Sequence, residues 1–341
     1  MANRDTVRKK QETGKEEDMM KPDKVIIKDV EITKPGKYDL VIAGASLAGI
    51  GAALANMQKG KSVVIIERTS LIGGEFIDAI RHGDPGGYSI KRPECLELKQ
   101  DAVRRNLVSE TGRLHLPPFA PLLFSIIRRT GIRILFMTDI TGVSREDGHF
   151  RIDIYNVSGF DSLEADEVID TTAEFVTNMK YKSDIRSKSL NCYVTGGELL
   201  HEDVFRDGVS AGADRTRFKG DAFKSDGPIN RKVVFERGRF SNETVMKFPL
   251  EPGDGWAEAR AKLAAFMTDR PESLREVKVI CAANTFEMKT GSVFYEVLKA
   301  SDECRGWYRL VSGAYDNLFE AYDKGLEMAL REDVRREAAI K

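Results

Sequence analysis

The sequence contains few of the residues that form covalent or metal cross-links. Only four cysteines and four histidines occur among 341 residues. The cysteines are Cys95, Cys192, Cys281 and Cys304, and no two of them form a CxxC pair. Such scattered cysteines argue against a disulfide framework or a structural zinc site and favour a reducing, cytoplasmic compartment. The histidines are equally scattered, so no metal site is predicted.

An excess of charge of one sign is also missing. The chain carries 53 basic and 54 acidic side chains, for a formal net charge of −1. General nucleic-acid binders rely on an excess of positive charge, so no nucleic-acid partner is predicted. The hydrophobic content of 41% is typical of a globular protein, and the length suits about two domains or one large one.

No segment has the pattern of a signal peptide or a membrane span. Residues 1–23 are rich in charge and lack an apolar core, which predicts a disordered leader. The longest apolar stretch, residues 38–57, contains Asp39 and a central break rich in Gly and Ser. We therefore expect this stretch to be buried within a soluble fold and not to cross a membrane.

The same stretch divides into the parts of a βαβ unit. Residues 40–43 form a short apolar run, typical of a strand buried on both faces. A turn over 44–49 overlaps a predicted helix over 47–58, and residues 62–66 predict a second buried strand. The whole spans about 30 residues, the usual size of one βαβ unit.

The turn between the first strand and the helix has the spacing of a dinucleotide-binding motif. Gly44 and Gly49 stand at the positions for the tight bend and for close packing of helix on strand. Backbone N–H groups at the helix start, together with the helix dipole, attract phosphates. Ser46 replaces the middle glycine, and its side chain is expected where a phosphate should approach.

An acid follows the second strand, at the place where the motif requires one. Glu67 comes 18 residues after Gly49 and directly follows the apolar run. A carboxylate at the carboxyl edge of the sheet can accept hydrogen bonds from ribose hydroxyls. The flanking strands and helix are present as well, so the sequence predicts a dinucleotide site.

The rest of the chain alternates between clear and weak patterns. In the first half we predict a loop over 73–87, a helix over 114–130, a strand over 132–136 and a three-stranded antiparallel meander over 138–172. In the second half, little periodicity is found over 177–230, strands are predicted over 232–240, 276–282 and 309–311, and helices over 255–268 and 316–337.

A second feature narrows the kind of dinucleotide. The run ERTSLIGG from Glu67 to Gly74 places a glycine pair about seven residues after the acid. With DLVIAGASLAGIGAA before it, this pattern resembles the bacterial FAD-dependent oxidoreductase family, which has a glutathione-reductase-like FAD-binding Rossmann fold. PLLFSIIRRTGIRILFMTDITGV, EVIDTTA and RLVSGAYDNLFEAYDKGLEMAL resemble later segments of that family, so the likeness covers residues 38–175 and 305–335.

This resemblance implies an α/β fold with FAD as the cofactor. The FAD-type Rossmann domain, with a parallel sheet and an antiparallel β-meander, would be discontinuous, formed by residues 24–175 and 305–341. Residues 176–304 would be an inserted α+β substrate or cap domain. No second strand–GxGxxG–helix is found, so the electron partner would be the substrate alone, an external electron acceptor or a partner subunit.

The resemblance also implies which residues bind FAD. The expected set is Gly44, Ala45, Ser46, Ala48, Gly49, Glu67, Arg68, Gly73, Gly74, Ile140, Thr172, Ala173, Gly313 and Asp316. The backbone near Ile140 would contact adenine, and Gly313 would lie near phosphate or flavin. Ser46, Ala173 and Ala314 depart from the family pattern, and Asp316 is expected to cap the last helix in place of the missing acid.

The activity implied is hydride transfer from an unidentified small molecule to FAD. His82, in the loop after the glycine pair, is a candidate proton acceptor, although an ordinary loop histidine is the commoner explanation. The departures from the family pattern motivate one alternative, a degenerate non-catalytic or partner subunit that keeps the FAD fold. The other alternative is a thiazole-synthase-like dinucleotide-using enzyme.

Overall fold

The computed structural model describes residues 36–83, 88–178, 185–196, 215–217, 233–240, 242–270, 272–290, 296–297 and 306–328. The leader predicted over residues 1–23 lies outside these ranges, as does Cys304.

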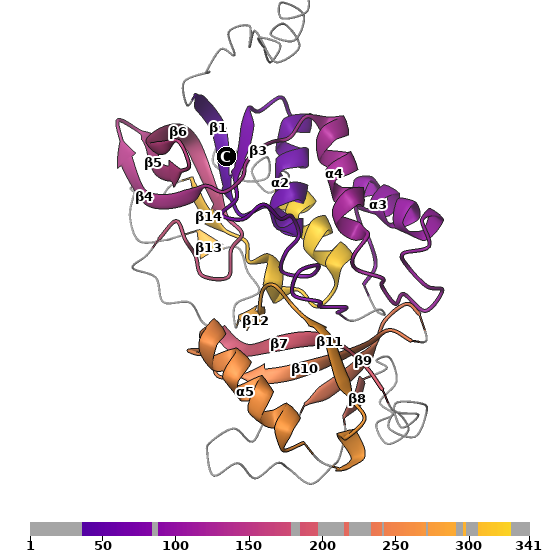
Figure 1. Ribbon diagram of the computed structural model, residues 1–341. Helices are drawn as coiled ribbons and strands as arrows, with labels where there is room; N and C mark the ends of the chain where they lie inside the picture. The colour runs from indigo at the N-terminus through magenta and orange to yellow at the C-terminus, as the bar shows by residue number, and fades with distance from the viewer. Residues whose placement is uncertain are drawn as a thin grey trace, which may run out of the picture. The chain divides into compact units, whose positions relative to one another are not determined.

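A mostly parallel sheet forms the part of the chain that carries the dinucleotide motif (Figure 1). Its strands, in spatial order, are β13 (Glu296–Val297), β14 (Trp307–Arg309), β6 (Gly159–Asp170), β1 (Lys37–Ala43), β2 (Val63–Ile66) and β3 (Arg133–Leu135). All neighbours are parallel except β13 and β14. The short apolar runs of β1 and β2 are buried, as expected for strands covered on both faces.

Helices cover one face of this sheet. They are α2 (Leu47–Gln58), α3 (Pro93–Arg104), α4 (Phe119–Thr130) and the helix over 318–328. Their apolar side chains join Leu40, Ile42 and Ile65 in one core cluster. Helix α3 was not predicted, because its apolar stripe is short, and the helix predicted over 114–130 starts five residues before α4 does. Residues 117–118 are both proline, which ends extended chain and favours a helix start directly after them.

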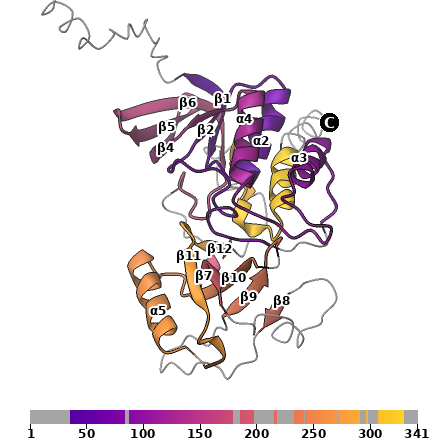
Figure 2. The ribbon, with the colours of Figure 1, turned by 45° about the vertical axis from the view of Figure 1, so that its right-hand side comes forward.

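The other face of the sheet carries the meander (Figure 2). Strands β4 (Asp139–Glu146) and β5 (His149–Asn156) pair antiparallel with each other, and β5 pairs with β6. Strand β6 is long enough for two tasks, because its second half also pairs with β1 from Glu164 onward. The predicted three-stranded meander is confirmed.

A second sheet is entirely antiparallel. Its order is β11 (Lys278–Ala282), β7 (Ile185–Thr195), β10 (Thr244–Leu250), β9 (Val234–Arg237) and β8 (Arg215–Arg217), with β12 (Glu287–Thr290) also paired to β7. Helix α5 (Trp256–Thr268) packs on it through Ala259 and Phe266. A short 3-10 turn, η3 (Glu272–Leu274), precedes β11. The predicted fold class, an α/β Rossmann-type sheet with meander plus an α+β part, is confirmed.

The central strand of the second sheet was not predicted. Strand β7 lies in the stretch over 177–230 that has little periodicity, and β10 and β12 were missed as well. The register of β7 is fixed by partners on both sides, with Cys192 opposite both Met246 and Ala282. Pairing of this kind, between segments 50 to 90 residues apart, leaves no local signal.

Helix 318–328 packs against α2 backbone to backbone. A Cβ added to Gly51 would meet the carbonyl oxygen of Tyr322 at 2.3 Å, and one added to Gly325 would meet that of Ala48 at 2.1 Å. Only glycine allows so close an approach. The helix begins at 318, two residues later than expected, because the Asn317 side chain accepts a hydrogen bond from the Phe319 N–H at 2.8 Å.

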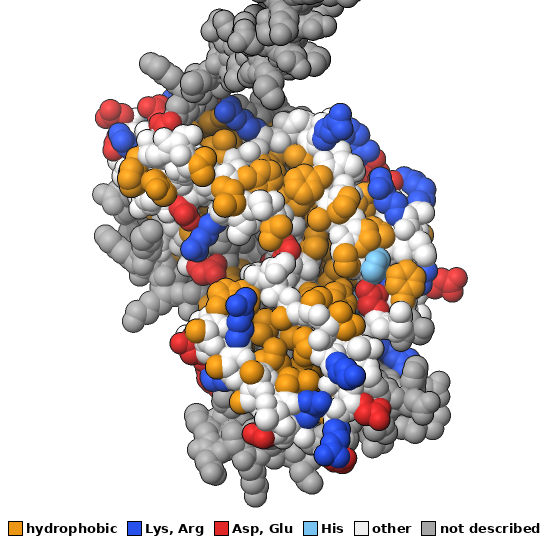
Figure 3. Space-filling model, in the orientation of Figure 1, with side chains coloured by type: hydrophobic (Ala, Val, Ile, Leu, Met, Phe, Trp, Pro, Cys, Tyr) orange, Lys and Arg blue, Asp and Glu red, His pale blue; other side chains and the backbone are white. Residues whose placement is uncertain are grey.

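Charged side chains are interspersed on one face of the described part of the chain. On the face drawn in Figure 3, basic and acidic groups alternate without a field of one sign, in keeping with the net charge of −1. Within the described ranges, no helix combines the length and the apolar character needed to cross a membrane.

Candidate cofactor-binding site

The carboxyl ends of four parallel strands lie side by side. Ala43, the last residue of β1, is in register with Ile66 of β2 and with Asp170 of β6, and Asp170 is in register with Arg309 of β14. In open α/β sheets, ligands bind outside this edge. The segments that follow these strands contain most of the predicted site residues.

The turn after β1 requires its two glycines. Gly44 has φ +93°, and its N–H donates to the Ile66 carbonyl at 2.8 Å. A Cβ at Gly44 would also meet Thr171 Oγ1 at 2.9 Å, and one at Gly49 would meet the Gly44 carbonyl oxygen at 2.4 Å. The tight bend and the close helix packing expected of a dinucleotide turn are therefore both present.

Ser46 caps the helix. Its Oγ accepts a hydrogen bond from the Gly49 N–H at 3.0 Å and donates one to Thr171 Oγ1 at 2.8 Å. Thr171 Oγ1 in turn donates to the Ala43 carbonyl at 2.8 Å. The side chain is buried in this network. Ser46 is thus the N-cap of α2, and its Oγ binds a backbone N–H at the helix start, where a phosphate was expected to approach.

The first two N–H groups of α2 also donate to side-chain oxygens. The Leu47 N–H donates to Glu75 Oε1 at 2.8 Å, and the Ala48 N–H donates to Ser312 Oγ at 3.1 Å. The Ser312 hydroxyl donates to the same Glu75 oxygen at 2.5 Å. Burial raises the pKa of Glu75 above its ordinary value, while the bonds from Ser312 and Leu47 oppose that rise. Neither Glu75 nor Ser312 was predicted as a site residue.

These contacts test whether the helix start suits a dinucleotide. The Leu47 N–H donates to a carboxylate oxygen and the Ala48 N–H to a hydroxyl oxygen, so both groups already bind oxygen atoms. A pyrophosphate presents oxygens of the same chemistry. The residues therefore fit FAD, whose pyrophosphate would need the place that the Glu75 carboxylate has in this structure.

Glu67 binds back to the turn from the end of β2. Its Oε2 accepts from the Ala45 N–H at 2.8 Å, and its Oε1 accepts from the N–H and hydroxyl of Thr69 at 2.8 and 2.7 Å. These bonds fix the carboxylate at the carboxyl edge of the sheet. The neighbouring Arg68 is exposed and pairs with Asp139 at 3.2 Å. Ile140, next in β4, is buried in the core cluster of the meander face.

The glycine pair after Glu67 returns the chain to α2. The Gly73 N–H donates to the Ala45 carbonyl at 2.8 Å, and Gly73 has φ +62°. A Cβ at Gly73 would meet the Leu47 side chain at 2.7 Å, whereas one at Gly74 would approach only the end of Asp78, at 3.5 Å. Gly73 is therefore needed for the geometry, while the sterics place no such demand on Gly74.

The segment after β6 is fixed by a buried carboxylate. Asp170 accepts from the Thr172 N–H and hydroxyl at 2.9 and 2.6 Å and from the Thr177 N–H at 2.8 Å. Burial raises the pKa of Asp170, and these bonds oppose the rise. The Ala173 carbonyl accepts from Arg309 Nη2 at 3.5 Å. Thr171, which links the turn to this segment, was not predicted. The TTA run after a buried strand was its only signal.

The segment after β14 is fixed by Arg81. Its guanidinium donates to the carbonyls of Gly313 and Tyr315 at 2.8 and 2.6 Å and pairs with Asp316 at 3.1 Å. Gly313 lies in the 3-10 turn η5 (Ser312–Ala314). Asp316 also pairs with Lys289 at 2.5 Å. The prediction that Asp316 caps the last helix is therefore wrong, because its carboxylate binds these cations while Asn317 makes the cap.

Arg81 continues into a buried ionic cluster with the second sheet. Its Nε lies 3.3 Å from Glu287, which also pairs with Lys247 at 2.9 Å. Although burial by itself would raise it, Lys247 and Arg81 together hold the pKa of Glu287 below its ordinary range. Asn191 of β7 donates to Glu287 and to the Ala79 carbonyl, both at 2.8 Å. These bonds join the loop after Gly73–Gly74 to the second sheet.

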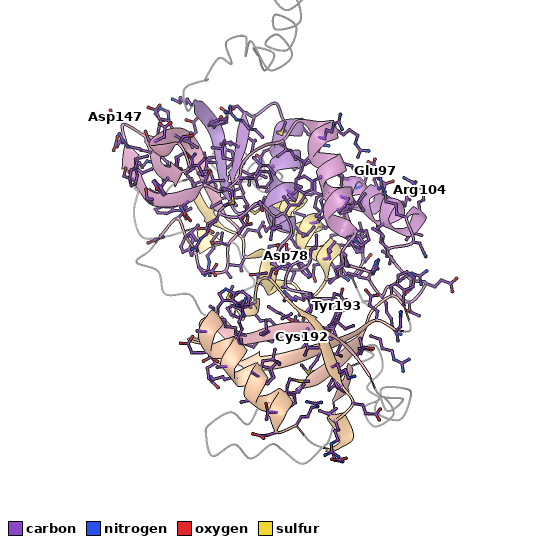
Figure 4. The ribbon with its side chains drawn as sticks, in the orientation of Figure 1. Asp78, Glu97, Arg104, Asp147, Cys192 and Tyr193 are labelled. Carbon is purple, nitrogen blue, oxygen red and sulfur yellow. The ribbon has the colours of Figure 1, made fainter. Side chains whose placement is uncertain are left out.

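His82 lies against the same sheet. It is 6% exposed, and its Nε2 lies 3.4 Å from the hydroxyl of Tyr193. Tyr193 and Cys192 follow each other on β7 and so point to opposite faces (Figure 4). Burial lowers the pKa of His82 to about 4, so it is neutral at pH 7.

Within the described ranges, no group of three or more His, Cys, Asp or Glu side chains could hold a metal ion.

The part of the chain that carries this turn matches a known protein family. Residues 39–174 match the model of a family described as FAD dependent oxidoreductase. A search of curated proteins finds no match to the sequence.

Solved structures resemble the chain over most of its length. Glycine oxidase from Geobacillus kaustophilus is 12% identical with a TM-score of 0.53, covering 86% of this chain and 95% of its own. p-Nitrophenol 4-monooxygenase from Pseudomonas putida DLL-E4 is 13% identical with a TM-score of 0.52, covering 90% and 80%. A geranylgeranyl bacteriochlorophyll reductase-like protein from Thermoplasma acidophilum is 14% identical with a TM-score of 0.53, covering 89% and 80%. At these identities the likeness shows the fold. The family match confirms the resemblance inferred from the sequence and the choice of FAD as cofactor.

Proposed function

Residues 39–174 match the FAD dependent oxidoreductase family, and we propose that the chain is an FAD-dependent oxidoreductase that takes a hydride from a small-molecule substrate onto the flavin. The observation that carries this proposal is the start of α2, where the N–H groups of Leu47 and Ala48 bind side-chain oxygens beside a carboxylate, Glu67, at the end of the next strand. This arrangement suits the pyrophosphate and ribose of one dinucleotide.

We propose that the residues predicted from the sequence hold FAD as follows. Backbone N–H groups of the turn and of α2 would bind the pyrophosphate, with Gly44 and Gly49 providing the room for it. Glu67 would accept hydrogen bonds from the ribose, and the strand at Ile140 would adjoin the adenine. The remaining contacts would come from Ala45, Ser46, Ala48, Arg68, Gly73, Gly74, Thr172, Ala173, Gly313 and Asp316.

When bound, FAD supplies an acceptor for two electrons and a proton. The chain supplies orientation. The Arg81 guanidinium holds the carbonyls of Gly313 and Tyr315 in place, which fixes the segment ahead of helix 318–328. His82 is neutral at pH 7 and adjoins the Tyr193 hydroxyl, so it could hold a proton only briefly with a pKa of about 4. A positioning role suits it better than that of a strong base.

We keep the discontinuous domain division as part of the proposal, with 24–175 and 305–341 forming the FAD-binding domain and 176–304 inserted. Pairing of β14 with β6 supports it, as does the packing of Gly325 on α2. Strand β13 lies inside the inserted range yet pairs with β14, so the boundary at 304 would move to about 295. An external electron acceptor or a partner subunit and a cytoplasmic location complete the proposal.

The family match does not favour either alternative, the degenerate subunit or the thiazole-synthase-like enzyme. The direct test is to add FAD to the purified protein, remove free flavin by gel filtration and record the visible spectrum. Retained flavin that bleaches without air on addition of a candidate substrate supports the proposal. Protein that stays colourless after incubation with FAD contradicts it.

A further inference from the structure

We propose that Glu75 is an internal competitor for the cofactor site, with its carboxylate binding the start of α2 until the FAD pyrophosphate displaces it. This inference rests on the proposed function, because it assumes that FAD binds at this helix. It assigns to Glu75 control over how tightly the cofactor is held.

The hydrogen bonds of α2 show what the carboxylate does. Ser46 is the N-cap, so Leu47, Ala48 and Gly49 carry the first three N–H groups without a partner inside the helix. Glu75 accepts from the first, Ser312 from the second and Ser46 from the third. Side chains of this protein thus satisfy the three donors that a bound phosphate would use.

The position of Glu75 is built into the loop. The Gly73 N–H is bonded to the Ala45 carbonyl, and the N–H groups of Phe76 and Ile77 donate back to the Gly73 carbonyl at 3.1 and 2.9 Å. This closed turn holds residue 75 over the first residue of α2. The Ser312 hydroxyl, from the other end of the chain, then orients the same carboxylate oxygen. Two segments 237 residues apart therefore converge on one anion.

The contact is suited to exchange. Burial disfavours the charge on Glu75 and raises its pKa, so moving the carboxylate out into water relieves its desolvation and offsets part of the loss of its hydrogen bonds. A pyrophosphate offers several oxygens to the same N–H groups. Gly74 has open space around it, with no contact closer than 3.5 Å for an added Cβ, so the adjoining backbone can adjust while the side chain leaves.

The size of the effect follows from the bonds that FAD must replace. A hydrogen bond to a charged group contributes about 1.5–3 kcal/mol, which corresponds to roughly 10- to 100-fold in a dissociation constant. Removing the competitor should tighten FAD binding by that factor. The protein without FAD should become less stable, because the Leu47 N–H and the Ser312 hydroxyl lose their acceptor.

The experiment compares wild type with Glu75→Ala, Glu75→Gln and a control, Asp78→Asn. Asp78 is a carboxylate of the same loop (Figure 4), with a pKa also raised by burial, but its side chain hydrogen-bonds Asn284 and lies near the charge of Glu67, whereas Glu75 accepts from the start of α2. The readouts are the dissociation constant for FAD, from quenching of flavin fluorescence, and the melting temperature without FAD.

The proposal predicts that Glu75→Ala binds FAD roughly 10- to 100-fold more tightly than wild type while melting at a lower temperature without it. Glu75→Gln, which keeps the shape and loses the charge, should bind with intermediate affinity, and Asp78→Asn should match wild type. A purely structural Glu75 would give weaker or unchanged FAD binding in Glu75→Ala, and that result would overturn the inference alone. If neither the wild type nor any of the variants binds FAD, the proposed function fails.

Discussion

The third residue of the dinucleotide turn offers the sharpest test of the geometry. In Gly49→Ala the new methyl group would lie 2.4 Å from the Gly44 carbonyl oxygen and 3.1 Å from Thr171 Oγ1. The nearest neighbour is backbone, which cannot rotate away, so α2 must move from β1. Overpacking costs about 1–3 kcal/mol, and this contact belongs in the upper half of that range. Better helix propensity returns about 1 kcal/mol. We expect a net loss of about 1–2 kcal/mol in the free energy of unfolding.

The assay is urea unfolding followed by circular dichroism, together with titration of FAD. Gly253→Ala is the matched control, because a Cβ there meets nothing within 4 Å and should change stability by less than about 0.5 kcal/mol. Movement of α2 also displaces the N–H groups that would bind pyrophosphate, so FAD affinity should fall at least about tenfold, or 1.4 kcal/mol. Unchanged stability and unchanged affinity in Gly49→Ala would refute the close approach of helix and turn.

Two further outcomes follow from the same region. Ser46→Ala removes the N-cap and should lower the free energy of unfolding by about 1 kcal/mol, whereas Ser46→Gly should lose only a few tenths, as measured by urea unfolding; equal losses would argue against capping. His82 has a pKa lowered by burial to about 4 from 6.5, so it is neutral in the folded protein and contributes stability above pH 6.5 that is lost as the pH falls toward 4. The loss in the free energy of unfolding over the whole range is about 3 kcal/mol by linkage. The part of it lost between pH 7 and pH 5 should be smaller in His82→Gln than in wild type. Glu243, Lys247 and His115 also act on His82, so a slope that is the same in both proteins would assign the pH dependence to those groups instead.

The dinucleotide turn could be predicted because its signals are local. The apolar runs of β1 and β2, the glycines at 44 and 49 and the acid at 67 depend on sequence neighbours alone, and each lies where the spacing predicted. The meander was equally readable from its alternating pattern and its two tight turns.

Other features depend on segments that meet only in the folded chain. Glu75 and Ser312 are 237 residues apart in sequence, and neither has a pattern that points to the start of α2. Strand β7 has mixed polarity and is defined by its partners on both sides. Asn317, and not Asp316, caps the last helix because Arg81 and Lys289, from two other segments, attract the Asp316 carboxylate. Sequence spacing carries no information about any of these encounters.

The most direct test of the central claim is the equilibrium binding of FAD to the purified full-length chain, followed by the change in the flavin absorption spectrum. We expect saturable binding of one FAD per chain with a shifted visible spectrum, and weaker binding when Glu67→Ala removes the acceptor for the ribose hydroxyls. A spectrum identical to that of free FAD at every protein concentration would contradict it.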